Sequence, residues 1–117
     1  MKREIEEYRK TPVQYECDVV VCGGGTAGFT AALASARNGA DTILVERFGH
    51  VGGTLVNGAG PLHSFFNLYK AFAGAEKTQV VRGIPQEIVT RMMEASGSPG
   101  HLEQDKGGNY DSAITLI

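Results

Sequence analysis

The chain has 117 residues, which is about the size of one small domain. Its formal net charge is −2, so the sequence offers no basic surface for nucleic acid. It also contains no run of about 18 apolar residues, the length that a membrane-spanning helix needs. The sequence has two cysteines, and residues 1–10 are charged rather than apolar, so we expect a cytoplasmic protein.

Residues 1–15 form a polar leader that we expect to be solvated, with Pro12 breaking any short helix before the first strand. Cys17 and Cys22 follow, five positions apart, so their side chains should point to opposite faces of a strand. We therefore predict no disulfide and no metal site from this pair, and two small, buried apolar side chains instead.

The stretch 17–28 predicts a strand, a glycine turn and the start of a helix. Its three consecutive valines, residues 19–21, are typical of a strand covered on both faces. Gly23, Gly25 and Gly28 then follow with G-x-G-x-x-G spacing. In this dinucleotide-binding motif the first glycine permits the tight turn, the second lets backbone approach a pyrophosphate, and the third allows close helix packing. The free N–H groups at the start of the helix favour an anion there.

The residues after the glycine turn complete a βαβ pattern. Residues 26–38 are rich in alanine, with Phe29, Leu33 and Ala36 at helical spacing, and Gly39 suits a left-handed helix cap. Residues 42–46 predict a second, parallel strand that ends in Glu46, eighteen positions after Gly28. A carboxylate at this place accepts hydrogen bonds from a ribose hydroxyl. The alternative is an ordinary βαβ unit with a glycine turn and no nucleotide.

A second glycine pair, Gly52 and Gly53, comes six positions after the acid. It suits a loop whose backbone approaches a second part of the same ligand, and Thr54 is placed near the start of a short helix. The alternative is a glycine-rich surface turn.

These motifs resemble the N-terminus of FAD-dependent oxidoreductases, in the broad family that includes proteins related to the heterodisulfide reductase A subunit. The resemblance rests on residues 18–28, 43–47 and 52–54, and it extends to residues 79–89 and 97–100. Residues 81–85, Val-Arg-Gly-Ile-Pro, are its more specific part.

The resemblance implies an α/β fold in which residues 16–117 form the N-terminal part of an FAD-binding domain. This part would hold a Rossmann-like FAD/NAD(P)-binding βαβ unit and an incomplete parallel sheet. The resemblance also implies FAD as cofactor. The implied cofactor-binding residues are Gly23, Gly24, Gly25, Thr26, Ala27, Gly28, Glu46, Arg47, Gly52, Gly53 and Thr54.

Among these residues, the glycines of the first turn would line the pyrophosphate and Glu46 would hold the ribose. Arg47 would lie near the adenine, and residues 52–54 would lead toward the flavin. Some relatives carry iron–sulfur (4Fe-4S) clusters, but this sequence has no cluster-type set of cysteines.

The rest of the chain carries weaker signals. Residues 57–61 predict a turn, and Phe65, Leu68, Tyr69 and Phe72 have the spacing of one helical face, which we assign to core or partner-domain packing rather than flavin stacking. For His63 a structural role is favoured over one facing the flavin. Residues 85–95 predict a helix with Pro85 in its first turn and Ile88, Val89 and Met92 on its apolar face, ended by Gly97 with Pro99. Residues 107–109 predict a turn, and residues 112–117 a strand.

We therefore expect the FAD-binding N-terminal portion of a flavin-dependent oxidoreductase, with no catalytic acid, base or nucleophile identified in this segment. Two alternatives stay open: the NAD-binding domain of a dehydrogenase, and a non-catalytic nucleotide-binding or interaction module. We expect the chain to be a gene fragment or one subunit of a split enzyme. Its function would then need the remainder of the polypeptide or a partner subunit. The substrate and the redox partner are not predicted.

Overall fold

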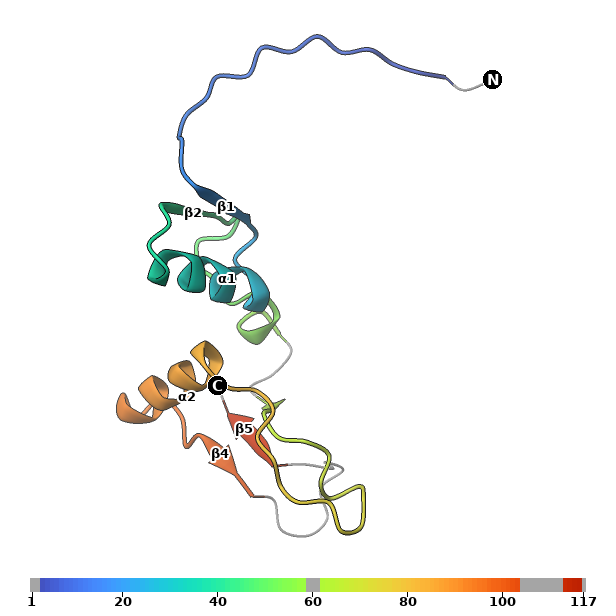
Figure 1. Ribbon diagram of the computed structural model, residues 1–117, viewed down its shortest axis with the longest axis vertical. Coiled ribbons are helices and arrows are strands. Elements are labelled where there is room, and N and C mark those ends of the chain that lie inside the picture. Colours follow the sequence, from blue (N-terminus) through green and yellow to red (C-terminus); the bar gives the residue numbers. More distant parts are fainter. Residues whose placement is uncertain (1–2, 59–61, 104–112, 117) are drawn as a thin grey trace.

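The computed structural model describes residues 3–58, 62–103 and 113–116. Figure 1 shows an extended N-terminal segment followed by two small units, one above the other. The elements are β1 (Val19–Cys22), α1 (Thr26–Arg37), β2 (Thr42–Val45), the 3-10 helix η1 (Gly53–Leu55), β3 (Leu62–Ser64), α2 (Ile84–Glu94), β4 (His101–Leu102) and β5 (Ile114–Leu116).

The first unit is the predicted βαβ unit. β1 and β2 pair in parallel, with Val19 opposite Thr42 and Cys22 opposite Val45, and α1 packs against both strands. Helix α1 ends at Arg37, and Gly39, two residues further on, has a left-handed φ of 90° and donates its N–H to the Ala36 carbonyl. This is the glycine cap predicted from the sequence. The α/β, Rossmann-like assignment with an incomplete parallel sheet is therefore confirmed.

One face of this two-stranded sheet is open. Val20 is 58% exposed and Val45 54% exposed, because α1 covers only the other face. The prediction that the valine strand is covered on both faces is therefore wrong within the described residues. The prediction that Cys22 is buried is also wrong, since its side chain follows Val20 onto the exposed face, whereas Cys17 is partly buried. Both cysteines are free thiols.

The second unit contains an antiparallel sheet that the sequence did not predict. Strand β5 lies between β3 and β4, and α2 packs beside this sheet. Most of the buried side chains belong to this unit: Phe65, Val89, Ala113, Ile114 and Thr115. The predicted strand at residues 112–117 is confirmed for Ile114–Leu116, and residues 112 and 117 lie outside the described residues.

The predicted helical face through Phe65, Leu68, Tyr69 and Phe72 is wrong. Phe66 instead forms an antiparallel bridge with Gln79, and the N–H of Val80 donates to the Phe65 carbonyl. Leu68 and Phe72 are 52% and 64% exposed. Phe65 alone of the four is fully buried. The aromatic spacing was compatible with a helix, but the chain turns back on itself between residues 67 and 78 and uses these backbone groups for pairing.

Helix α2 matches the predicted helix to within a residue. Pro85 lies in its first turn, and Val89 is fully buried, as predicted for the apolar face. The helix ends in a Schellman motif in which Gly97 donates to the Met92 carbonyl. The left-handed residue of this motif is Ser96, with φ 58°, rather than the glycine.

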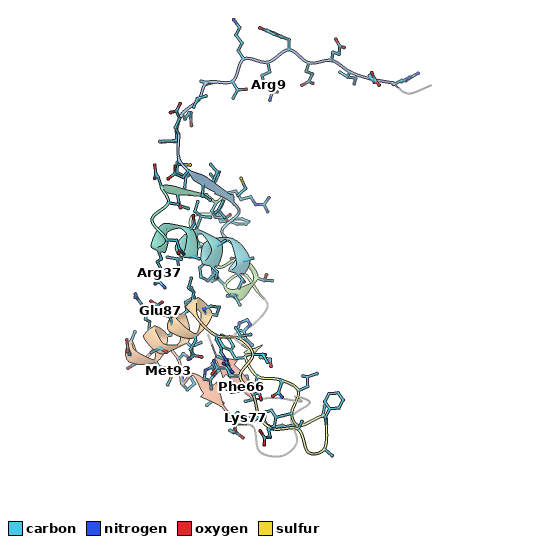
Figure 2. All side chains as sticks on the ribbon, in the orientation of Figure 1. Arg9, Arg37, Phe66, Lys77, Glu87 and Met93 are labelled. Carbon is cyan, nitrogen blue, oxygen red and sulfur yellow. The ribbon has the colours of Figure 1, made fainter. Side chains whose placement is uncertain are left out.

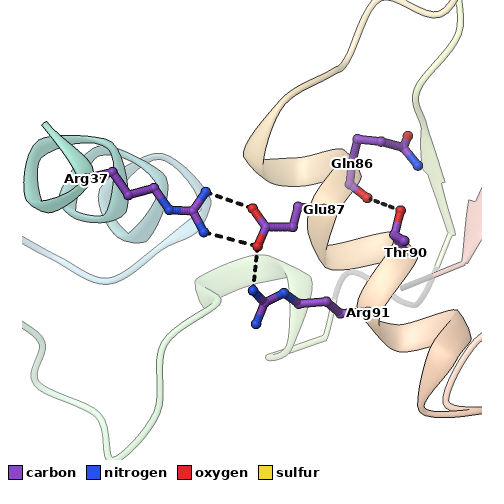
Figure 3. Close-up of polar contacts among 5 residues, drawn as sticks. All are labelled: Arg37, Gln86, Glu87, Thr90 and Arg91. Carbon is purple, nitrogen blue, oxygen red and sulfur yellow. Dashed lines mark hydrogen bonds and ion pairs between the residues drawn. The ribbon is translucent and has the colours of Figure 1, made fainter.

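An ion-pair cluster joins the two units. Arg37, the last residue of α1, forms a two-pronged ion pair with Glu87 of α2, at 2.7 and 3.0 Å (Figure 3). Arg91, one turn further along α2, holds the same carboxylate at 2.7 Å. The two arginines lower the pKa of Glu87, mainly through the hydrogen bond from Arg37. The cluster is solvent-accessible, so it orients the helices more than it stabilises the fold.

The described part of the predicted leader, residues 3–15, is exposed throughout and has no regular structure. Figure 2 shows its side chains, Arg9 among them, projecting away from both units. The Cα radius of gyration is 19.9 Å, against about 13 Å for a compact domain of this length. No helix in residues 3–58, 62–103 and 113–116 is long and apolar enough to cross a membrane. The predicted turn at residues 107–109 and residues 59–61 of the turn at 57–61 lie outside the described residues.

Candidate functional site

The first glycine turn joins β1 to α1, and two of its glycines are required by the fold itself. Gly23 has a φ of 97°, and its N–H donates to the Val45 carbonyl at 2.7 Å, which continues the parallel pairing into the turn. A Cβ on Gly28 would lie 1.8 Å from the Gly23 carbonyl oxygen. Helix α1 can therefore approach the turn this closely only because Gly28 has no side chain.

Gly25 is different, because neither packing nor backbone conformation requires a glycine there. Its φ of −64° and ψ of −179° suit any residue, and a Cβ would meet nothing within 4 Å. Gly25 is the N-cap of α1, and no side chain caps that helix. The first N–H groups of α1, at Thr26, Ala27 and Gly28, have no carbonyl partner within the helix. The open space at Gly25 therefore lies before an uncapped, partly positive helix end, which fits an anion such as a pyrophosphate.

The second glycine pair lies directly beside the first turn. The Gly52 N–H donates to the Gly24 carbonyl at 2.8 Å, and Gly52 pairs with Gly25 in a parallel bridge. A Cβ on Gly53 would come within 2.8 Å of the Gly25 Cα. Because Gly52 and Gly53 also have positive φ angles, side chains are disfavoured there on two grounds. The two loops together form one surface made of backbone, which we call the glycine surface (residues 23–28, 52 and 53).

Glu46 is fixed against the glycine surface. One carboxylate oxygen accepts the Gly24 N–H at 2.5 Å and the other accepts the Phe48 N–H at 3.0 Å. These backbone donors, Phe48 first and then Gly24, lower the pKa of Glu46 from its usual range. The carboxylate is therefore ionised and oriented at neutral pH, and each oxygen keeps a lone pair that can accept a hydrogen bond from a hydroxyl.

An exposed aromatic cluster follows the acid. The Arg47 guanidinium lies 4.7 Å from the centre of the Phe48 ring, and Phe48 stacks on His50 with ring centres 6.2 Å apart. The Arg47 side chain thus packs on the Phe48 ring, next to Glu46 in the chain. Thr54 lies in η1, next to Gly53 in the chain, and its side chain is exposed. The structure brings Glu46 and Gly52 into direct contact with Gly24. Arg47 and Thr54, in contrast, join this group only as the chain neighbours of Glu46 and Gly53.

Two features of the site were not foreseen from the sequence. One is the hydrogen bond from the Gly24 N–H of the turn to the Glu46 carboxylate. The other is the position of Val51, whose side chain would lie 2.9 Å from a Cβ built on Gly24. Gly24 therefore allows both the carboxylate and Val51 to approach the turn. No sequence signal identifies such contacts, because they arise only when the second loop folds back over the first.

The chain matches the model of a protein family described as FAD dependent oxidoreductase, over residues 18–115. The chain belongs to the FAD-dependent oxidoreductase family. The match spans β1, the glycine surface, α2 and most of β5, so the matched segment includes most of both units. The expected family and its cofactor, FAD, are thereby confirmed.

Proteins of known name that are similar to this chain include several dehydrogenases. A mitochondrial dihydrolipoyl dehydrogenase of Schizosaccharomyces pombe is 30% identical over 102 residues, which cover 86% of this chain and 18% of that protein. A mitochondrial dihydrolipoyl dehydrogenase of Caenorhabditis elegans is 33% identical, over 87% of this chain and 23% of that protein. A 3-oxosteroid 1-dehydrogenase of Mycobacterium tuberculosis is 47% identical, but over only 38% of this chain and 8% of that protein. No solved structure matches.

The chain spans about a fifth of the length of the dihydrolipoyl dehydrogenases that it matches. The residues present fit FAD: an uncapped helix end with space at Gly25 fits the pyrophosphate, and the oriented carboxylate of Glu46 fits a ribose hydroxyl. Among residues 3–58, 62–103 and 113–116, no three His, Cys, Asp or Glu side chains are grouped to hold a metal ion.

Proposed function

We propose that the chain is the FAD-holding part of a flavin-dependent oxidoreductase and that the glycine surface carries the cofactor's pyrophosphate. The observation that carries this proposal is Gly25, where the fold leaves open space that no structural requirement explains. That space lies before the N–H groups of Thr26, Ala27 and Gly28, which are directed at an anion placed there. Gly52 and Gly53 border it without side chains, so a second phosphate oxygen can approach from their side.

In this proposal Glu46 holds the ribose of the adenosine half. Its carboxylate is already fixed by Gly24 and Phe48, so little side-chain entropy is lost when a hydroxyl donates to it. Arg47 and Phe48 lie next along the chain, where the adenine ring would follow the ribose. A carboxylate at this position also disfavours a 2′-phosphate by charge repulsion. Residues 52–54 lie on the other side of the turn and lead toward the flavin half.

When bound, FAD supplies hydride or electron transfer, and the residues of this chain bind and orient it. We assign no catalytic role to a side chain of the glycine surface. Its side chains include no acid, base or nucleophile other than the hydroxyl of Thr26. The match to an FAD-dependent family favours FAD over the nicotinamide alternative. The exposed Val20 and Val45 support packing against further polypeptide, either of the same protein or of a partner subunit. We propose a cytoplasmic location, because both cysteines are free thiols and disulfides are rare in that compartment.

The test is the identity of the bound cofactor and its dependence on Gly25. The chain is purified together with the further polypeptide that covers Val20 and Val45 and is then denatured. The released cofactor is separated by chromatography and identified by its absorbance. We expect FAD in the wild-type protein and none in the Gly25→Val variant. Release of a nicotinamide dinucleotide, or equal FAD content in the two proteins, would contradict the proposal.

A further inference from the structure

Gly24 is the residue at which the loop after β2 is tied to the first glycine turn. Its N–H donates to the Glu46 carboxylate at 2.5 Å, and its carbonyl accepts the Gly52 N–H at 2.8 Å. Residues 46 and 52 are the two ends of that loop, so both ends are bonded to the same residue. A side chain that packs on Gly24 therefore acts on both attachments of the loop.

Val51 is the side chain that packs there. A Cβ built on Gly24 would lie 2.9 Å from Val51 Cγ1 and 3.0 Å from Glu46 Oε2. The methyl group and the carboxylate oxygen thus share the place that a side chain on Gly24 would take. The φ angle of Gly24 is not left-handed, so this crowding, rather than the backbone conformation, is what requires a glycine.

Val51 also shields the hydrogen bond that holds Glu46. The bond is only partly buried, so water can compete for both of its groups. A methyl group beside it excludes water from that side, and a charge-assisted hydrogen bond is stronger where water is excluded. Val51 itself is 46% exposed, so truncating it should cost the fold little.

We propose that Val51 is a positioning residue for Glu46, because by packing on Gly24 it holds the carboxylate in the orientation that receives the ribose hydroxyl. This inference rests on the proposed function. Phe48 holds one carboxylate oxygen and Gly24 the other, so weakening the bond to Gly24 leaves the carboxylate free to turn about the first. Ordering the freed side chain again when a ligand binds lowers the affinity roughly three- to tenfold.

The first experiment measures the positioning without a ligand, by amide hydrogen exchange in the chain purified with the further polypeptide that covers Val20 and Val45. Val51→Ala should speed the exchange of the Gly24 N–H by about threefold or more. The Gly23 N–H, which donates to the Val45 carbonyl, should exchange as in wild type. A general loss of stability would speed both amides, so the comparison separates positioning from stability.

The second experiment measures the affinity of the same preparation for FAD, ADP and riboflavin. Val51→Ala should weaken the binding of FAD and ADP about three- to tenfold and leave that of riboflavin, which has no adenosine half, within about twofold. Val51→Ile keeps a branched side chain at the same place and should bind all three ligands as wild type does. Val80→Ala is the matched control, because Val80 is an exposed valine of the second unit, and it should change none of the three affinities.

A double-substitution cycle tests the contact itself. Gly24→Ala adds the Cβ that meets Val51 Cγ1 and should weaken ADP binding about tenfold. In the chain that carries both Gly24→Ala and Val51→Ala, the crowding methyl group is gone, so the ADP affinity should rise about threefold above that of Gly24→Ala alone. Losses that simply multiply in the double variant would show that the two residues act independently, and would overturn the inference.

The outcomes separate this inference from the proposed function. Wild-type ADP affinity in Val51→Ala, or equal changes in the exchange of the Gly23 and Gly24 amides, overturns the role of Val51 while Glu46→Ala still loses ADP binding. Wild-type ADP affinity in both Glu46→Ala and Gly25→Val overturns the proposed function instead.

Discussion

Substituting Gly25 and Gly28 separates a glycine kept for a ligand from a glycine kept for the fold. A Cβ at position 25 enters open space, so Gly25→Val should lower the free energy of unfolding by no more than about 1 kcal/mol, the usual loss when a helix N-cap residue is replaced by a poor cap. A Cβ at position 28 would stand 1.8 Å from a backbone oxygen of Gly23. That oxygen cannot move far, since Gly23 is hydrogen-bonded to Val45, and Gly28→Ala should cost about 1–3 kcal/mol.

For FAD binding the order of the two substitutions is reversed, because Gly25 is the one that faces the proposed ligand. The valine side chain at position 25 occupies the place before the free N–H groups of α1, and each charge-assisted hydrogen bond lost there contributes about 1.5–3 kcal/mol. Losing one of them weakens FAD binding by roughly 10- to 100-fold, and losing two weakens it by roughly 100-fold or more, since each 1.4 kcal/mol is about tenfold. Gly28→Ala should weaken FAD binding only as far as it unfolds the protein.

The assay uses the chain together with the further polypeptide that we expect to cover Val20 and Val45, and it pairs urea unfolding, followed by circular dichroism, with FAD titration followed by flavin fluorescence. Gly25→Val should be destabilised by no more than the loss of a helix cap, about 1 kcal/mol, and should lose FAD affinity. Near-normal FAD affinity in a folded Gly25→Val variant would refute the reasoning, because the space at Gly25 would then serve no ligand. A loss of stability as large as that of Gly28→Ala would also refute it, since packing would then explain the glycine.

Three further outcomes follow from the same structure. Glu46→Ala should weaken FAD binding roughly 10- to 100-fold and leave riboflavin binding unchanged, because riboflavin lacks the adenosine half; equal losses in isothermal titration would place Glu46 elsewhere. Burial, and secondarily the charge of Lys77, lowers the pKa of His101 in the folded protein. The stability that neutral His101 contributes is therefore fully present above the unfolded-state pKa of about 6.5, and it is lost as the pH falls through the lower folded-state pKa. Thermal melting between pH 7.5 and 5 should therefore show a loss that His101→Gln reduces and that the exposed His50→Gln does not; equal pH dependence in both variants would contradict this role. Expressed alone, this chain should unfold without a sharp transition and bind FAD weakly with no turnover, because Val20 and Val45 stay exposed; stoichiometric flavin with a cooperative melt would show otherwise.

The βαβ unit was predictable because its signals are local. Three valines, a glycine turn, an alanine-rich helix and Gly39 follow one another within about 25 residues, and each favours the element that forms. Glu46 was found by its distance from Gly28, since a right-handed crossover brings the end of β2 beside the turn.

The second unit was not predictable by the same means. Strand β5 pairs with β3 across some fifty residues, and the short strands β3 and β4 have no alternating pattern of their own. The aromatic residues 65–72 fit a helical period by spacing alone, yet the carbonyl of Phe65 and the bridge at Phe66 are used by residues 79–81 instead. Tertiary pairing overrides local spacing in such segments.

Some contacts of the second unit show why its side chains were equally hard to assign. His101 belongs to no motif of the sequence, but its two ring nitrogens lie 2.7 Å from Thr115 Oγ1 and 2.9 Å from Gln86 Oε1. Lys77 lies 4.6 Å from the centre of the Phe66 ring and pairs with Glu103 (Figure 2). These contacts join residues from separate elements, so no spacing in the sequence reveals them.

The claim that FAD is held by backbone groups of the glycine surface is tested most directly by titrating the isotope-labelled protein with FAD and following its amide resonances. We predict that the largest shifts fall on the N–H groups of residues 24–28, with further shifts at Gly52 and Gly53, and that ADP reproduces those of residues 24–28. FAD binding that leaves the amides of residues 24–28 unmoved would contradict the account.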